Sequence, residues 1–404
     1  MHRPTCLAVV CIVAALAAPA RASIADFFTD LYIFGDSLSD SADSRRAPGS
    51  NLRDGPSNTL QTTEGVFGAA FGFPPTPYFN GRFSNGPVWS DALIAKFEAA
   101  GKIGVNFSFG GAQAVQEIDL PIDIPDFADQ RLQFQFDPTI TPGSNALGIV
   151  GFGGNDLLAA TSATSNLIDP GTGQPLPEAQ ILANVTQDAI AAADEIRTQI
   201  DLFDIATLGS VAVLNLGDVG ATPRYANKFL PNGDPNPLFA VRGVASAATA
   251  AFNARLAENA GLLRASGREI FLVDIATPLA ALLADPLGNG FIDATTPCGV
   301  PIGSNPVTGL PIVDFGAPDG FGLEGGISPT GCVTEPFSAL AGVPANDDLY
   351  GWTDDVHPQT RVHDLIAAEI SGTIAAAIPL PAPLALMTGA LVLLAGCARA
   401  RRSA

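Results

Sequence analysis

The chain has 404 residues, of which 20 are basic and 40 are acidic, so its formal net charge is −20. This acidic excess excludes nucleic acid as a partner, because proteins that bind DNA or RNA place Lys and Arg on the phosphates. The 42 glycines and 33 prolines exceed the usual share but fall short of a disordered or collagen-like composition. We therefore expect one large globular domain with long, irregular loops.

The first 22 residues have the order of a secretory signal peptide. Arg3 provides the basic start, an apolar run extends from Leu7 to Leu16, and Ala20-Arg21-Ala22 is a small-x-small cleavage site. A buried N-terminal helix would not explain this order of basic, apolar and small residues. The sequence therefore predicts an exported protein whose mature chain begins at residue 23.

Five short apolar runs in the mature chain predict β-strands. The first of them, Leu31-Tyr32-Ile33-Phe34, has no polar face, which is typical of a strand that is covered on both sides. The five predicted strands are 31–34, 103–109, 147–152, 211–216 and 270–273.

Helical patterns alternate with these strands. Apolar residues recur at helical spacing in four segments, namely 89–97, 182–200, 252–263 and 362–374. Alternating strands and helices predict an α/β fold, specifically a three-layer α/β/α sandwich around a central parallel sheet. Segments 43–85, 161–177 and 285–348 are rich in Gly, Pro and polar residues and are predicted to be loops, some of them facing the substrate.

Residues 23–377 form the predicted working domain. They carry 15 basic and all 40 acidic residues, a net charge of −25, which keeps an exported domain soluble and repels anionic surfaces. Two of the five cysteines, Cys298 and Cys332, lie in this domain. We expect them to form a disulfide in an oxidising compartment. No further metal ligands lie near them in the sequence, so we expect no metal there.

The last 27 residues, 378–404, form a distinctive tail. Ile378-Pro379-Leu380-Pro381-Ala382 leads into an apolar run over 383–398, and Arg399, Arg401 and Arg402 follow. This tail resembles the bacterial PEP-CTERM sorting signals in their Val-Pro-Leu-Pro-Ala variant. The resemblance implies a transient membrane anchor that a sorting protease removes. We expect the protein in the periplasm, at the cell surface or in the extracellular space of a bacterium. A plain C-terminal membrane anchor is the alternative, since the run is just long enough to span.

Two histidines remain as candidates for acid–base chemistry, because His2 leaves with the signal peptide. His363 lies inside the last helical pattern, which favours a structural or surface role. His357 lies in Asp354-Asp355-Val356-His357-Pro358, where a carboxylate can orient the ring and stabilise its charged form. The chain has no P-loop, no HExxH, no CxxC and no G-x-S-x-G elbow. It also lacks a D-x-D-x-D-G calcium loop.

Three glycine-containing motifs follow the first three predicted strands. Ser37 lies in Gly35-Asp36-Ser37-Leu38, Gly110-Gly111 follows the second strand, and Gly153-Gly154-Asn155-Asp156 follows the third. Strand ends of this kind are where α/β sheets bind their ligands. Backbone N–H groups beside glycine and an Asn amide are suitable donors to an oxyanion.

In this order, the motifs resemble those of the GDSL (SGNH) family of esterases and lipases. The matching blocks are 34–40, 106–112, 153–156 and 354–358, and two further stretches, 81–89 and 214–223, resemble one bacterial and plant branch. The chain departs from that branch at Ser41-Ala42-Asp43, where the branch has Thr-Gly-Asn. This difference affects the shape of the loop after Ser37.

The resemblance implies a flavodoxin-like sandwich of the SGNH hydrolase type that needs neither a cofactor nor a metal. It also implies a catalytic set in which Ser37 is the nucleophile, His357 is the base, and Asp354 rather than Asp355 orients the base. The Ser37 and Gly111 backbone N–H groups and the Asn155 amide would form the oxyanion hole.

Asp36 and Asp156 are expected to fix their loops rather than to take part in catalysis. The predicted function is that of an exported serine esterase or lipase, hydrolysing carboxylic esters through an acyl-enzyme on Ser37. Two alternatives remain open: an acetyl esterase acting on extracellular polysaccharide, and a non-catalytic surface or matrix protein on the same scaffold. The substrate would be a lipid, a short-chain ester or an acetylated glycan. A long apolar groove beside Ser37 would favour lipid, and a shallow polar crevice would favour acetyl or sugar esters.

Overall fold

The computed structural model describes residues 23–41, 79, 82–116, 124–229, 235–304, 311–314, 331–334, 338 and 342–378. The predicted signal peptide over 1–22 and the tail beyond residue 378 lie outside the described residues. So does most of the predicted loop over 43–85.

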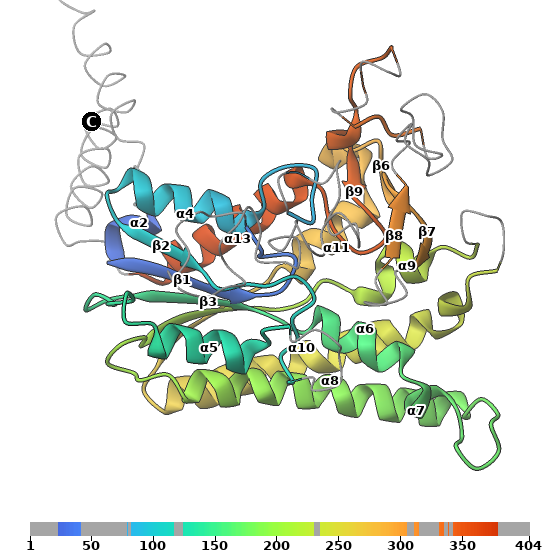
Figure 1. The fold of residues 1–404 in the computed structure, drawn as a ribbon, viewed down its shortest axis with the longest axis horizontal. Coiled ribbons are helices and arrows are strands. Elements are labelled where there is room, and N and C mark those ends of the chain that lie inside the picture. The colour runs from blue at the N-terminus through green and yellow to red at the C-terminus, as the bar shows by residue number, and fades with distance from the viewer. Residues whose placement is uncertain are drawn as a thin grey trace, which may run out of the picture.

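A five-stranded parallel sheet forms the centre of the molecule (Figure 1), in the order β2-β1-β3-β4-β5. This is the strand order of the flavodoxin-like doubly wound fold. Ile33 of β1 lies beside Asn106 of β2 and Ile149 of β3, so the carboxyl ends of these strands reach the same edge. The strands are β1 (Asp30–Gly35), β2 (Ile103–Asn106), β3 (Leu147–Gly151), β4 (Ser210–Leu214) and β5 (Glu269–Val273).

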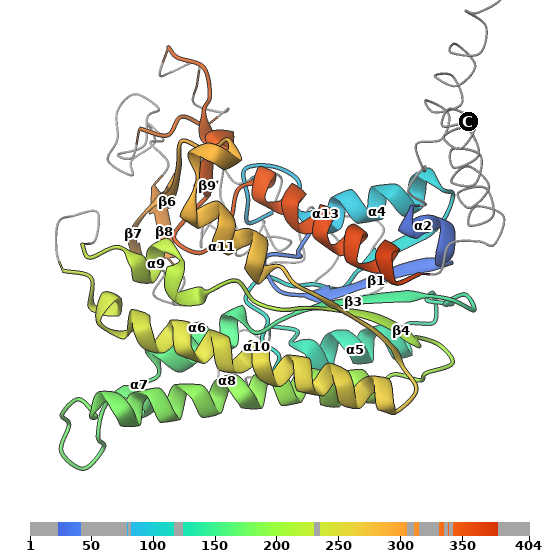
Figure 2. The ribbon, with the colours of Figure 1, turned by 180° about the vertical axis from the view of Figure 1, so that it is seen from behind.

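Helices cover both faces of this sheet, as Figures 1 and 2 show from opposite sides. Tyr32 and Phe34 of β1 belong to the core on one face, and Leu31 and Ile33 belong to the core on the other. The helices of the first core are α5 (Phe127–Phe136), α6 (Gly154–Ser162), α8 (Glu178–Asp201) and α10 (Arg242–Ala265). Those of the second are α2 (Ile24–Phe27), α4 (Trp89–Ala99) and α13 (Thr360–Ala377).

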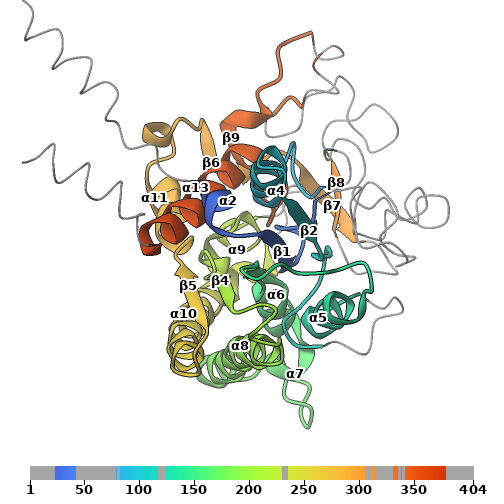
Figure 3. The same ribbon diagram turned by 90° about the vertical axis from the view of Figure 1, so that its left-hand side faces the viewer.

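The side view in Figure 3 separates the layers, with α4 and α13 on one side of the strands and α8 and α10 on the other. The predicted three-layer sandwich is therefore confirmed. All six residues of β1 are buried, because helices cover both sides of the sheet. Among the described helices, none is both long and apolar enough to cross a bilayer.

The segment predicted as a loop over 285–348 contains regular structure, which corrects that interpretation. β6 pairs in parallel with β9, and β7 pairs antiparallel with β8. These strands have three to five residues and irregular register, so they leave no clear period-2 pattern in the sequence. They are β6 (Asp293–Pro297), β7 (Val300–Ser304), β8 (Pro311–Asp314) and β9 (Tyr350–Trp352).

Short helices fill the remaining connections. The predicted loop over 161–177 includes one of them, and sequence periodicity also missed α5, α6 and α11, each of ten residues or fewer. The short elements are α7 (Thr164–Leu167), α9 (Pro223–Ala226), α11 (Ala276–Ala284), η4 (Val219–Ala221), η5 (Pro237–Val241), η6 (Leu287–Asn289) and η7 (Asp347–Leu349).

Cys298 and Cys332 are joined in a disulfide, with their Cα atoms 5.2 Å apart, the pair expected from the sequence. Both cysteines are fully buried. The backbone N–H of Cys298 donates to the carbonyl of Trp352 at 2.9 Å, and that of Gly299 donates to the carbonyl of Thr353 at 2.7 Å. The cross-linked segment therefore lies against the chain that leads into Asp354.

Candidate active site

Ser37, His357 and Asp354 form a continuous hydrogen-bonded chain. The Nε2 atom of His357 lies 2.8 Å from Ser37 Oγ, and its Nδ1 atom lies 2.6 Å from Asp354 Oδ2. The second carboxylate oxygen of Asp354 accepts the backbone N–H groups of Val356 at 2.8 Å and His357 at 2.7 Å. Asp354 is only 1% exposed. The turn thus folds around the carboxylate, which fixes the orientation of the imidazole ring.

Residues outside the turn over 354–358 also hold the segment that bears His357. The Phe83 ring stacks on the His357 ring with centroids 4.9 Å apart. Ser84 Oγ donates to the carbonyl of Pro358 at 3.0 Å, and the Thr353 N–H donates to the carbonyl of His357 at 2.7 Å. Phe83 and Ser84 belong to the stretch over 81–89 that the sequence singled out, so this stretch supports the base.

Asp355 is separate from this chain, because it pairs with Arg224. The guanidinium donates from Nε at 2.8 Å and from Nη2 at 3.2 Å to the two carboxylate oxygens, and the Arg224 backbone N–H donates to the Asp355 carbonyl at 2.9 Å. Burial alone would lower the pKa of Arg224, but the adjacent carboxylate raises it above its ordinary value. Arg224 therefore remains charged. It was not among the residues predicted from sequence, although it directly follows the Thr222-Pro223 part of a recognised stretch.

The nucleophile side depends on Gln130, which no sequence motif indicated. Its Oε1 atom accepts the Gly35 N–H at 2.9 Å, and its Nε2 atom donates to the carbonyls of Gly35 at 2.8 Å and Pro125 at 2.9 Å. Gln130 is fully buried. A Cβ atom on Gly35 would lie 2.6 Å from Ser39 Oγ and 2.9 Å from the Gly151 carbonyl oxygen. Glycine is required there because the neighbouring chain approaches so closely.

The loop after β1 is tied to the loop after β2. Asn106 Nδ2 donates to the carbonyl of Ser39 at 2.6 Å and to Ser41 Oγ at 2.8 Å. Asp40 accepts the Gly110 N–H at 3.0 Å. Ser41, at a position where the related branch has Thr, is thus part of this tie, while Asp43 lies outside the described residues.

Asp36 is buried directly beside Ser37. Its Oδ1 atom accepts the Leu38 N–H at 3.0 Å, and its backbone carbonyl accepts the Ser39 N–H at 3.0 Å. Burial raises the pKa of Asp36 to about 7, although the Leu38 hydrogen bond opposes this shift. These contacts fix the turn that carries Ser37, in agreement with the expected loop-fixing role.

The three expected oxyanion donors lie on three neighbouring loops. Gly111 has φ +89°, a left-handed conformation that favours glycine. Asn155 lies in the first turn of α6, and its Nδ2 atom donates to the carbonyl of Ala112 at 2.9 Å. Within the described ranges, the backbone N–H groups of Ser37 and Gly111 donate to no residue. They remain available to a bound oxyanion.

Asp156 holds the second and third of these loops together. Its two carboxylate oxygens accept the backbone N–H groups of Ala114 at 2.9 Å and Val115 at 3.0 Å. The residue before α6, Gly153, has φ +116°, and a Cβ atom there would lie 2.5 Å from Phe252. This packing positions the start of α6 beside Ser37.

His363 lies in α13, six residues after His357. It is buried, and neither ring nitrogen has a hydrogen-bond partner among the described residues. Burial, reinforced by nearby His357, lowers the pKa of His363 to about 3. His363 is therefore a neutral core residue, which selects the structural role from the structural or surface role that its position in the helical pattern predicted. Across the same described ranges, no group of three or more His, Cys, Asp or Glu is arranged to hold a metal ion.

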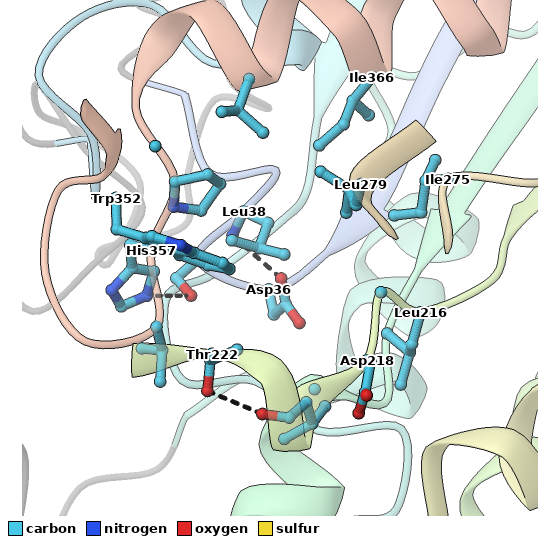
Figure 4. A pocket seen from close by; sticks show the side chains of 18 of the residues that line it. Asp36, Leu38, Leu216, Asp218, Thr222, Ile275, Leu279, Trp352, His357 and Ile366 are labelled. Carbon is cyan, nitrogen blue, oxygen red and sulfur yellow. Dashed lines mark hydrogen bonds between the residues drawn. The ribbon is translucent and has the colours of Figure 1, made fainter. Parts of the chain in front are cut away.

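A pocket that opens to solvent includes Ser37 and His357 in its lining. In Figure 4, His357 lies on one side of this pocket, while Leu279, Ile275 and Leu216 lie on the other. The remaining apolar side chains that line it are Leu38, Leu158, Val219, Leu282, Leu283, Trp352, Val356, Pro358, Val362 and Ile366. The surface beside Ser37 is therefore a predominantly apolar pocket.

The site places a buried carboxylate, an imidazole and a serine hydroxyl in line, beside the backbone N–H groups of Ser37 and Gly111. These groups define a serine hydrolase type of site. The model of the GDSL-like lipase/acylhydrolase family matches residues 31–370. The chain therefore belongs to this family, and it is an ester hydrolase.

Among known proteins, the chain is 24% identical over 348 residues to a phosphatidylcholine-sterol acyltransferase of Aeromonas hydrophila, covering 83% of this chain and 87% of that protein. It is 17% identical to an extracellular lipase of Streptomyces rimosus, with a TM-score of 0.33 and coverage of 62% of this chain and 82% of the lipase. It is 10% identical to an acetylxylan esterase of Geobacillus stearothermophilus, with a TM-score of 0.30 and coverage of 63% and 80%.

Proposed function

We propose that the protein hydrolyses carboxylic esters through an acyl-enzyme on Ser37. His357 Nε2 takes the proton of Ser37 Oγ as the oxygen attacks the ester carbonyl carbon. The imidazolium then gives this proton to the leaving alkoxide, and the acyl group stays on Ser37. A water molecule attacks the acyl-enzyme with His357 again as the base, which releases the carboxylic acid and restores the serine.

The remaining roles follow from charge development in the transition state. Asp354 holds the ring through Nδ1–H and stabilises the imidazolium. The N–H groups of Ser37 and Gly111 and the Asn155 amide receive the negative charge on the carbonyl oxygen. The observation that carries the proposal is the unbroken chain from Ser37 Oγ to His357 to Asp354, at 2.8 and 2.6 Å.

The test measures hydrolysis of 4-nitrophenyl butyrate by the purified full chain. We expect Ser37→Ala to lose at least 10³-fold in kcat, on the order expected when a triad nucleophile is removed. Ser162→Ala is the matched control, because Ser162 is exposed on α6. Equal rates for Ser37→Ala and wild type would overturn the proposal.

A non-catalytic surface or matrix protein on this scaffold is the less favoured alternative. Such a protein has no need of a serine, histidine and buried carboxylate in hydrogen-bonding order, and the three are assembled here. The measurement with 4-nitrophenyl butyrate also tests this alternative, because a non-catalytic protein would show no turnover that depends on Ser37. The other alternative, an acetyl esterase acting on extracellular polysaccharide, concerns the substrate and is decided by acyl-chain preference.

We also propose that the protein is exported and transiently anchored in a bacterial envelope. The order of features in 1–22 and the sorting motif and arginine cluster in 378–404 support this, as does the Cys298–Cys332 disulfide, which suits an oxidising compartment. Fractionation and intact-mass measurement of the expressed full chain would test it. We expect a mature N-terminus at residue 23, and loss of membrane association when 378–404 is deleted or cleaved by a sorting protease. A cytoplasmic chain that retains residues 1–22 would contradict the proposal.

A further inference from the structure

We infer that the pocket beside Ser37 binds the acyl chain of a fatty acid ester, and that leucines of α11 set the chain length it accepts. This inference rests on the proposed ester hydrolysis and names its substrate class. Its occupant is an unbranched hydrocarbon chain longer than butyryl, because apolar side chains continue the lining from Ser37 and His357 to the leucines of α11.

The position of the pocket relative to the reacting atoms supports an acyl chain. Ser37 and His357 form one part of its lining, and Asn155 lies beside them. An ester that reacts at Ser37 Oγ therefore lies partly in this pocket, and the proposal assigns that part to its acyl chain. Across the pocket from His357, the labelled side chains in Figure 4 include Leu216, Ile275 and Leu279. These side chains favour a hydrocarbon over a sugar, whose hydroxyl groups would lose hydrogen bonds to water there.

Helix α11 contributes three leucines to the lining of the pocket, Leu279, Leu282 and Leu283. Leu282 is 2% exposed and packs in a small core with Phe291 and Val362. Leu282 is therefore a fixed part of the lining, because its position is held by this packing.

Asn215 ties α11 to the central sheet. Its Oδ1 atom accepts the N–H groups of Ile275 at 2.8 Å and Ala276 at 3.0 Å, and its Nδ2 atom donates to Asp274 at 2.8 Å. Asn215 directly follows β4, in the stretch over 214–223 whose role the triad left unexplained. The same stretch meets the helix again at Gly217, where a Cβ atom would lie 2.8 Å from Leu279 Cδ1. The position of the leucines relative to Ser37 is thus set by the sheet.

The experiment measures kcat/KM of the full chain on 4-nitrophenyl acetate, butyrate, hexanoate, octanoate and decanoate. We expect kcat/KM to rise with chain length beyond butyrate, by about fourfold for each buried CH₂ group, until the pocket is filled. A maximum at acetate or butyrate, with turnover that still depends on Ser37, would overturn this inference and leave the proposed hydrolysis intact. Loss of Ser37 dependence would overturn the hydrolysis itself.

The variants Leu279→Trp and Leu283→Trp test the role of α11. Each fills part of the pocket, so we expect the ratio of octanoate to acetate kcat/KM to fall at least tenfold. Leu287→Trp is the matched control, because Leu287 is 77% exposed just beyond α11 and does not line the pocket. Its ratio should stay at the wild-type value. An unchanged ratio in both folded pocket variants would overturn the assignment to α11.

A measurement on the wild type alone keeps the inference testable if neither variant folds. Free butyrate, hexanoate, octanoate and decanoate are tested as competitive inhibitors of acetate ester hydrolysis. We expect the inhibition constant to fall steadily with chain length. Inhibition constants that do not change from butyrate to decanoate would contradict an acyl-chain site.

Discussion

The two halves of the catalytic site are held in position by different means. Ser37 directly follows β1, the strand between β2 and β3 in the parallel sheet, and Gln130 and Asn106 bind the chain on either side of it. His357 follows β9, which belongs to a separate two-stranded sheet. Its turn is held by the Arg224–Asp355 ion pair and by the chain next to the Cys298–Cys332 disulfide.

This difference indicates which contacts matter for stability and which for catalysis. The strand that carries the nucleophile is buried between two helical layers, so disturbing it should weaken the whole domain. The turn that carries the base depends on a few polar contacts and one cross-link. Disturbing these contacts should change the geometry of the base more than the stability of the central sheet.

The largest expected effect comes from Asp354→Asn. We expect kcat for ester hydrolysis to fall by about 10⁴-fold, because an amide cannot stabilise the imidazolium and favours the wrong tautomer of His357. Steady-state kinetics would measure the loss.

Asp355→Asn is the matched control for Asp354→Asn, with the same chemical change one residue away. It weakens the pair with Arg224, so we expect about a tenfold loss in kcat from poorer positioning of the base. Similar losses in the two variants would mean that Asp354 has no special role.

Removal of the disulfide in the variant with Cys298→Ser and Cys332→Ser tests the base side. The bridge closes a sequence separation of 34 residues, so its loss should lower the free energy of unfolding by about 3–4 kcal/mol. On heating this variant, we expect activity to be lost at a lower temperature than the one at which the α8–α10 layer unfolds. The reason is that the cross-linked segment supports the chain before Asp354. Calorimetry and activity assays would measure both. Adding a reductant to the wild type should likewise lower the temperature at which activity is lost, and it should not change the variant further.

Gln130→Ala tests the nucleophile side. It leaves the buried N–H of Gly35 without its acceptor and takes a donor from the Gly35 carbonyl, so we expect a loss of about 3 kcal/mol in the free energy of unfolding. Gln133→Ala in the same helix is the control, since the Gln133 Oε1 atom has no hydrogen-bond partner among the described residues. Equal denaturant midpoints for the two variants would contradict the importance of the Gln130 contacts.

The smallest expected effect is the dependence of stability on pH through His363. Its pKa is about 3 in the folded protein and about 6.5 when unfolded. As the pH falls below 6.5, the unfolded chain takes up a proton that folded His363 does not, so stability is lost. When the pH is lowered from 7 to 5, we expect the free energy of unfolding to fall by roughly 2 kcal/mol less in His363→Leu than in the wild type. Parallel pH profiles of the unfolding midpoint would contradict this.

Much of this arrangement could be predicted from local sequence. The five apolar runs predicted the strands, because burial on both faces leaves no polar position in β1. The three-residue spacing of Asp354 and His357 allows a single turn to join carboxylate and ring. The motifs at the strand ends placed Ser37, Gly111 and Asn155 at one edge of the sheet, because parallel strands bring their carboxyl ends together there. The resemblance to the GDSL family then implied the role of each residue.

Other features depend on tertiary packing. Ser37 and His357 are 320 positions apart, and Gln130 and Arg224 act on backbone and side chains far from them in sequence. The apolar pocket requires α11, whose Ala- and Leu-rich sequence gives no sign of which leucines face Ser37. The sequence by itself determined the order of elements and the reacting groups, because burial pattern and short motifs are local. Only the tertiary structure decided what supports those groups and which side chains line the pocket beside them, because these depend on which distant surfaces pack together.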